Sequence, residues 1–229
     1  MFWGPSIAAL FGTKPGVSAK DLAEIMGEKL SPYNDPMMMN YSDEGIYSDS
    51  MVKLVAWHRH YTRFWKQSIQ YCDWSYGDFW NQYGPKGRGI TGEAEPKFLN
   101  AVTGGKTTFD QGMELGRKIW NLDRAIWVLQ GRHRDQEVFA AYNYDVGALP
   151  GFTTYEVPYV MPVYEKGEWS YKSVGGRKLD RAKVEEFKTK FFAFEGWDTA
   201  TGAPTRKTLE SLELGKVADA LEAAGKLGK

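Results

Sequence analysis

The residues best suited to chemistry lie around the single cysteine, Cys72. The stretch RHYTRFWKQSIQYCDWSYGDFW, residues 59–80, places Cys72 near the end of a helical pattern, and two of the three histidines, His58 and His60, stand near the start of that pattern. A thiol can act as a nucleophile beside a histidine base, or as a metal ligand. Because fourteen residues separate His58 from Cys72, a helix would hold them about 21 Å apart. The two side chains therefore cannot ligate one metal ion together, and the geometry for a thiol–imidazole pair is poor.

The pattern around Cys72 predicts a helix from Met51 to about Cys72, capped by Ser50. Its apolar stripe should face a core, which makes His58 a hydrogen-bonded core residue, whereas His60 should be solvated. The stripe runs at alternating spacings of four and three through Leu54, His58, Tyr61, Trp65, Ser68 and Cys72.

Familiar catalytic motifs are absent from the sequence. It contains no phosphate-binding glycine loop of the usual spacing, no H-E-x-x-H and no G-x-S-x-G. A 4Fe-4S cluster needs four thiolates, and this chain supplies one at most. Two readings of Cys72 stay open: an inert buried thiol, or one ligand of a cluster completed by residues elsewhere.

Composition narrows the class of protein. The 229 residues are 42% hydrophobic and 15% aromatic, which allows a sizeable core or an extensive interface. Lys and Arg together equal Asp and Glu at 29 each, so a generic nucleic-acid surface is not expected. No apolar run is long enough to cross a bilayer. One cysteine excludes an intrachain disulfide and is consistent with a reducing, cytoplasmic location.

The elements around the Cys72 helix predict a mainly α fold with at most a small β-hairpin. We expect a helix over 19–30 capped by Ser18, a loop that includes three methionines at 37–39, and a glycine- and proline-rich loop over 83–96. A strong helix should span 108–130, with Gly116 allowing another helix to approach closely. The following segment is either a short hairpin turning at Lys166-Gly167 or an irregular loop. Further helices should then begin near Asp180, with one apolar face, and after a candidate cap at Thr205, and a last amphipathic helix should follow. The residues expected on their apolar faces are Val184, Phe187, Phe191, Phe194, Val217, Ala220 and Leu221.

Several polar residues have structural interpretations. Ion pairs on a helix face are expected for Arg117, Asp123 and Arg124, and a solvated turn is expected for His133. Trp197 should be core, and Asp198 should fix a turn through local hydrogen bonds. We expect two parts in the chain: an N-terminal arm, short helix and loop over 1–50, and a helical domain over 51–229.

Three stretches together resemble the C-terminal part of the tungsten-containing aldehyde:ferredoxin oxidoreductase family. WKQSIQYCDW, residues 65–74, resembles the D-x-x-G-L-C element of that family. GMELGRKIWNLDRAIWVLQGRHRDQEVF, residues 112–139, is similar to its G-E-R-I-W-N-L-E-R helix. GWDTATGAPTRKTLESLELGKVADAL, residues 196–221, resembles its C-terminal G-W-D-x-x-G-x-P-T-R-x-T-L-x-x-L-G-L. The order and spacing of the three are kept from about Met51 to the C-terminus.

The resemblance implies a C-terminal helical domain and two cofactors, a 4Fe-4S cluster and a tungstopterin, both shared with a missing N-terminal part. Cys72 would be the metal ligand, and Gln67, Gln70 and Tyr71 the cofactor-binding positions, with no catalytic residue on this chain. The implied partners are an N-terminal tungstopterin-binding chain or domain and a ferredoxin or iron–sulfur electron-transfer subunit. The chain would then be a fragment or a split subunit that is not active alone.

The sequence also departs from the family element. Gln67 replaces its aspartate, Gln70 its glycine and Tyr71 its leucine, which implies a reshaped pocket wall without the carboxylate charge. These departures, with the segment 157–176, look more like the class II benzoyl-CoA reductase branch. The expected role is electron transfer in aldehyde oxidation or aryl-CoA reduction; the alternative is a non-catalytic helical interaction module of a redox complex.

Overall fold

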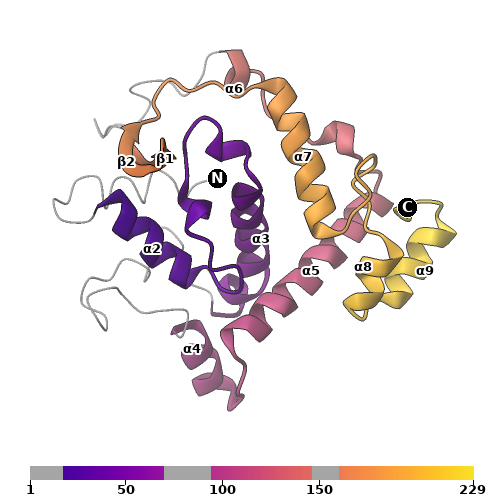
Figure 1. The fold of residues 1–229 in the computed structure, drawn as a ribbon. Helices are drawn as coiled ribbons and strands as arrows, with labels where there is room; N and C mark the ends of the chain where they lie inside the picture. The colour runs from indigo at the N-terminus through magenta and orange to yellow at the C-terminus, as the bar shows by residue number, and fades with distance from the viewer. Residues whose placement is uncertain (1–17, 70–93, 146–159) are drawn as a thin grey trace. The chain divides into compact units, whose positions relative to one another are not determined.

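The computed structural model describes residues 18–69, 94–145 and 160–229 (Figure 1). These residues are mainly helical, and their one sheet is a two-stranded antiparallel hairpin. The fold class predicted from the sequence is therefore confirmed. Two compact units divide the described residues: the first takes 18–51, 139–145 and 160–184, and the second takes 52–69, 94–138 and 185–229. The expected parts 1–50 and 51–229 stay a prediction.

The first unit begins with helix α2, Ala19–Lys29. Its N-cap is Ser18, as predicted, because the Ser18 hydroxyl accepts a hydrogen bond from the Asp21 amide at 3.0 Å. Two short 3₁₀ turns follow, η1 (Pro36–Met39) and η2 (Gly45–Tyr47). Met38 and Met39 are buried among them, which fits flexible side chains that fill irregular gaps in a core.

The hairpin of the first unit joins β1 (Val160–Glu165) to β2 (Glu168–Ser173), with Tyr164 opposite Trp169. Lys166 and Gly167 both have positive φ, the conformation that a tight two-residue hairpin turn requires. Helix α2 packs against both strands (Figure 1). The short helix α6, Tyr142–Asp145, also belongs to this unit.

Helix α3, Asp49–Ile69, corrects one expectation about capping. The hydroxyl of Ser48, not of Ser50, accepts from the amide of Met51 at 3.1 Å, and the Ser50 hydroxyl donates to Asp35. Most of α3 lies in the second unit. Serines at both positions satisfy the same sequence rule, so the pattern alone could not choose between them.

The second unit contains α4 (Ala94–Thr103) and α5 (Phe109–Leu129). Helix α4 is a correction, because its start falls inside the loop expected over 83–96. Pro96 suggested a loop, but proline is tolerated in the first turn of a helix, where the amide needs no intrahelical partner. Helix α5 begins with a capping box between Thr108 and Gln111 and ends at the expected place.

Towards the C-terminus, the described residues form α7 (Arg181–Glu195), α8 (Arg206–Ser211) and α9 (Gly215–Ala223). The predicted apolar stripe of α7 was wrong at its end: Phe194 is exposed, and Phe192 and Glu195 are buried instead. Thr205 caps α8 as predicted.

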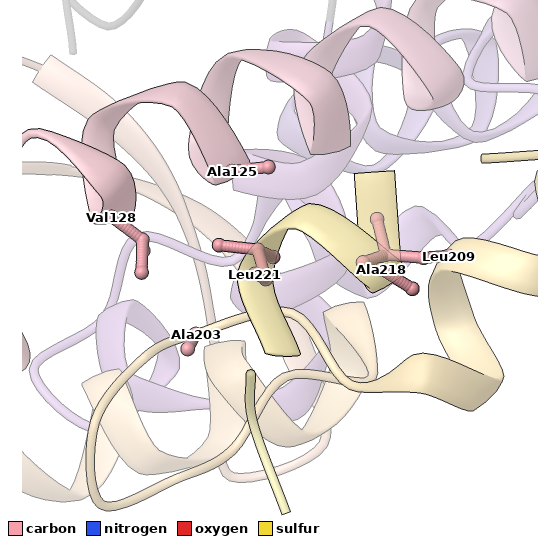
Figure 2. Close-up of a cluster of buried hydrophobic side chains, with 6 residues drawn as sticks. All are labelled: Ala125, Val128, Ala203, Leu209, Ala218 and Leu221. Atoms are coloured by element: carbon pink, nitrogen blue, oxygen red, sulfur yellow. The ribbon is translucent and has the colours of Figure 1, made fainter. Parts of the chain in front are cut away.

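A core cluster in the second unit joins α5 to the C-terminal helices. Figure 2 shows Leu221 of α9 between Ala125 and Val128 of α5, with Ala203 and Leu209 nearby. Distant parts of the sequence therefore share one core. Within the described stretches, no helix has the length and apolar character needed to cross a membrane.

Candidate functional site

Of the four predicted site residues, the structure describes one, and the roles predicted for all four stay predictions. Gln67 lies near the end of α3 with its side chain exposed. Gln70, Tyr71 and Cys72 lie outside the described residues. The described residues show what holds the end of α3, the helix that precedes Cys72 in the sequence.

Trp65 holds that end of α3 against the start of α5. Its side chain is fully buried, its indole N–H donates to the carbonyl of Phe109 at 3.0 Å, and its ring stacks on Phe109 with centroids 5.7 Å apart. A Cβ at Gly112 would lie 2.2 Å from the Trp65 ring, so only glycine leaves room for the indole. Trp65 and Gly112 thus fix the position of the last turns of α3 on α5.

His60 corrects the expectation of a solvated histidine. It is 3% exposed, and its Nε2 lies 3.0 Å from Oε1 of Glu195, which is fully buried near the end of α7. The buried side of α3 includes Val52, Ala56 and His60, and the polar ring is accommodated there because Glu195 supplies a hydrogen-bonding partner. The stripe predicted for α3 was therefore displaced, since Ser68 is exposed and His58 only half-buried.

A second contact between α3 and α5 is an ion pair beside an aromatic ring. Arg63 Nε lies 2.6 Å from a carboxylate oxygen of Asp123, and its guanidinium sits 5.3 Å from the centre of the Trp120 ring. The expected ion pair of Asp123 is thus found, with its partner on another helix. Burial and the nearby charge of Arg63 both lower the pKa of Arg59, one turn earlier on α3.

A buried arginine holds the end of α5 to the loop after α7. The Arg124 side chain is 3% exposed; its Nε donates to the carbonyl of Gly202 at 2.8 Å and its Nη1 donates to Glu137 at 2.5 Å. Its guanidinium lies 4.9 Å from the Trp197 ring centre. Arg124 was expected in an ion pair on a helix face, and the pair exists but is buried. The predicted core position of Trp197 is confirmed.

Glu137 receives hydrogen bonds from two arginines. Arg132 donates to it from Nε at 2.8 Å and from Nη2 at 3.0 Å, in addition to the bond from Arg124. Burial alone would raise the pKa of Glu137, but the hydrogen bonds and charges of Arg132 and Arg124 outweigh that effect and lower it from 4.5 to about 2. The carboxylate is therefore ionised at all ordinary pH values.

The turn after α7 behaves as the sequence predicts. One carboxylate oxygen of Asp198 accepts from the amides of Ala200 and Thr201, both at 2.8 Å, and the other accepts from Lys229. Burial opposes ionisation, but these backbone hydrogen bonds lower the pKa of Asp198. His133, expected in a solvated turn, is partly exposed and caps the 3₁₀ turn η5, Arg134–Gln136.

The described residues do not by themselves fit a metal ion or cluster, because no three of their His, Cys, Asp and Glu side chains lie close enough together to hold one. Gln67 does fit a role beside a planar heterocycle, since an amide offers both an acceptor and two donors. What this part of the chain provides is a rigid frame: α3 held at Trp65, at His60 and at Arg63.

The sequence analysis missed Gly112 and Glu195, which belong to this frame, and the Arg124–Glu137 pair, which lies outside it. The sequence does contain a signal for close packing at Gly112, since Gly112 lies four residues before Gly116 and the two occupy the same face of one helix. The sequence contains no signal for the burial of Glu195, because a carboxylate among phenylalanines is usually exposed. Glu137 lies thirteen residues from Arg124, too far for any helical rule to pair them.

Comparison with known protein families gives a match that covers most of the chain. A family model described as "Aldehyde ferredoxin oxidoreductase, domains 2 & 3" matches residues 24–214. The chain belongs to this family. The resemblance inferred from three motifs is thereby confirmed, and α3, α5, α7 and α8 all fall within the matched residues. No curated protein matches the chain.

Among solved structures, this member of the family is similar to a chain of the "Active site complex BamBC of Benzoyl Coenzyme A reductase in complex with 1,5 Dienoyl-CoA". The identity is 16% and the TM-score 0.48, over 95% of this chain and 29% of that chain. This family member thus spans less than a third of the length of that chain.

Proposed function

We propose that this chain is the C-terminal part of a tungstopterin and 4Fe-4S oxidoreductase and that Cys72 supplies one cluster ligand. Gln67, Gln70 and Tyr71 form part of the wall beside the pterin. The other ligands and most of the pterin site belong to an N-terminal chain or domain, and a ferredoxin or iron–sulfur subunit exchanges electrons with the assembled cytoplasmic enzyme. The observation that carries the proposal is the family match over residues 24–214, which includes the helix leading to Cys72.

The residues of this chain have a positioning role in the proposal. When bound, the cluster and the tungstopterin supply one-electron transfer at the active site. Trp65 and Gly112 hold the end of α3 against α5. Gln67 keeps an acceptor oxygen where the family has a carboxylate, and it binds by hydrogen bonds without charge. A rigid supporting frame is what a metal ligand needs to keep its geometry.

The reaction that the assembled enzyme carries out is aldehyde oxidation or aryl-CoA reduction. The polar and bulky replacements at Gln67, Gln70 and Tyr71 support the acyl-CoA branch, because they reshape the wall beside the pterin. Assays of the assembled enzyme with an aromatic aldehyde and with an aromatic acyl-CoA thioester separate the two.

The test replaces Cys72 in the assembled complex. The chain is co-expressed with its N-terminal partner, purified without oxygen, and compared with a Cys72→Ser variant for iron content, electron paramagnetic resonance and turnover. Because serine is a poor ligand for iron, we expect loss or alteration of the cluster signal and turnover reduced about tenfold or more.

The control is Ser68→Ala, four residues before Cys72 in the sequence, which removes a hydroxyl that donates to the Trp65 carbonyl. It should leave iron content and turnover unchanged. If Cys72→Ser also leaves both unchanged, the cluster assignment is wrong, and the chain is better described as a helical interaction module of the redox complex.

A further inference from the structure

Three arginines contact two tryptophans where α3 lies against α5. The guanidinium groups of Arg59 and Arg63 lie 5.6 Å and 5.3 Å from the centre of the Trp120 ring. Arg63 also lies 5.8 Å from the centre of the Trp127 ring, and Arg132, which follows α5, lies 5.6 Å from the same ring. Indole faces attract and orient guanidinium groups. The two rings therefore gather three cationic side chains at one place on the second unit.

Arg59 is the member of this group that lacks an anionic partner. Arg63 pairs with Asp123, and Arg132 pairs with Glu137. Among the residues that the structure describes, exposed Arg59 pairs with no carboxylate. It lies four residues before Arg63, and like charges at this spacing on a helix repel each other. A bound anion would offset that repulsion.

The charges around the two rings do not balance. Buried Arg124 donates from Nη1 to Glu137, the same carboxylate that pairs with Arg132. Four arginines therefore face only two carboxylates, those of Asp123 and Glu137, which leaves an excess of two positive charges. The bordering charged residues leave this excess unchanged, because two of them are cations and two are anions: Arg134, Lys188, Asp135 and Glu185.

Two buried donors in the same region also lack acceptors. The indole N–H of Trp120, the ring that Arg59 and Arg63 share, has no acceptor in the described part of the chain, and neither has Nη2 of Arg124. A buried donor without an acceptor costs free energy. The excess charge and the unused donors both indicate a ligand that is anionic and carries several acceptor oxygens.

We propose that the arginine–tryptophan cluster, defined by Arg59, Arg63, Trp120, Trp127 and Arg132, binds a phosphoryl group, either inorganic phosphate or the phosphate of a phosphomonoester. A phosphoryl group carries about two negative charges and three acceptor oxygens, which matches the excess of two positive charges. A carboxylate carries one charge and would leave the second unmatched. Arg59 supplies a guanidinium free to bind the group through two parallel hydrogen bonds. The site depends neither on Cys72 nor on the proposed cofactors.

Titration calorimetry of the full chain measures the binding directly. At a pH of about 8, where phosphomonoesters are dianions, inorganic phosphate and glycerol phosphate should both bind. Acetate at the same ionic strength should bind about tenfold more weakly, because it has one charge and two oxygens. Whichever phosphate binds more tightly identifies the source of the group. The proposal is overturned if neither phosphate binds at millimolar concentration, or if acetate binds as tightly.

Arg59→Gln is the deciding variant, because it removes an exposed cation and leaves the ion pairs of Arg63 and Arg132 in place. It should weaken phosphate binding about tenfold or more. The control is Lys118→Gln, which removes a cation of α5 that already pairs with Glu213 and should leave phosphate binding unchanged. Circular dichroism confirms that both variants keep their helices. Equal affinity of the two variants for phosphate would contradict the site.

The competing occupant is a carboxylate of the chain itself, and thermal unfolding separates the two. Without phosphate, Arg59→Gln removes a repulsion, so it should lower the unfolding midpoint no more than Lys118→Gln does. Added phosphate should raise the midpoint of the unsubstituted chain, and that of Arg59→Gln much less. A larger fall for Arg59→Gln in phosphate-free buffer would show that the chain already supplies the anion. That result, or equal stabilisation of both chains by phosphate, overturns the proposal.

Discussion

In the second unit, the stability of the fold depends strongly on one buried arginine, Arg124. Arg124 is fixed between Gly202, Glu137 and the ring of Trp197, and its charge is matched by one carboxylate. Removing that carboxylate leaves a buried cation without a counter-charge, which is far more costly than removing an exposed pair.

We therefore predict that Glu137→Gln lowers the free energy of unfolding at pH 7 by about 3 kcal/mol. The control is Glu210→Gln, which breaks an exposed pair with Arg206 and should leave the free energy of unfolding nearly unchanged. Urea titration followed by circular dichroism measures both. Equal small effects for the two variants would show that the Arg124 pair is not a special element of stability.

Glu137 should also make the stability of the fold depend on pH. The pKa of Glu137 is lowered to about 2 in the folded chain, against 4.5 in the absence of its partners. Its ionised form therefore stabilises the fold fully above pH of about 4.5, and that contribution is lost as the pH falls from there toward 2. The difference in unfolding free energy between the unsubstituted chain and Glu137→Gln should accordingly be constant near neutrality and shrink over this acid range.

At the scale of elements, the contact of α3 with α5 depends on two glycines. A Cβ at Gly116 would lie 1.9 Å from the carbonyl oxygen of His60, a backbone atom that a side-chain rotation cannot move. Gly116→Ala must therefore push the two helices apart. Because Trp65 sits on Gly112 one turn away, the end of α3 that leads to Cys72 would be displaced with it.

We expect Gly116→Ala to destabilise the chain by about 1–3 kcal/mol, the usual range for overpacking. The matched control is Gly215→Ala at the start of α9, where an added Cβ would meet nothing within 4 Å. Alanine there should be neutral or stabilising by up to about 1 kcal/mol, because it favours the helix. Thermal and urea unfolding compare the two, and a Gly116→Ala variant as stable as the control would refute the close approach.

Elements with strong periodicity and a capping signal were predictable, and those defined by tertiary partners were not. Gly116 indicated close helix packing because a small residue interrupted a bulky stripe, and the structure confirms it. The stripe of α3 was displaced because a histidine is polar in sequence but can be buried when a carboxylate such as Glu195 faces it. Of the predicted site residues, Gln67 lies on a helix with its side chain exposed, and its cofactor-binding role stays a prediction.

At the scale of the whole molecule, the chain is organised by segments that are far apart in sequence. The second unit combines residues 52–69, 94–138 and 185–229, so no contiguous part of the sequence contains its whole core. Local patterns predict helices, but they cannot say which stretch completes which core. This is why the family resemblance, which relates motifs from 65 to 221, predicted more about the molecule than any single helix did.

The C-terminal helices should therefore stabilise α5 as well as themselves. Leu221 of α9 is fully buried in the cluster with Ala125 and Val128 (Figure 2), so Leu221→Ala should leave a cavity and cost about 2–5 kcal/mol. The control is Val102 on α4, which is 88% exposed, and Val102→Ala should change the free energy of unfolding by less than about 0.5 kcal/mol. Hydrogen exchange followed by mass spectrometry provides the deciding measurement. If the second unit is one cooperative core, Leu221→Ala must speed exchange in α5 together with α9; faster exchange confined to α9 would show that the C-terminal helices unfold separately.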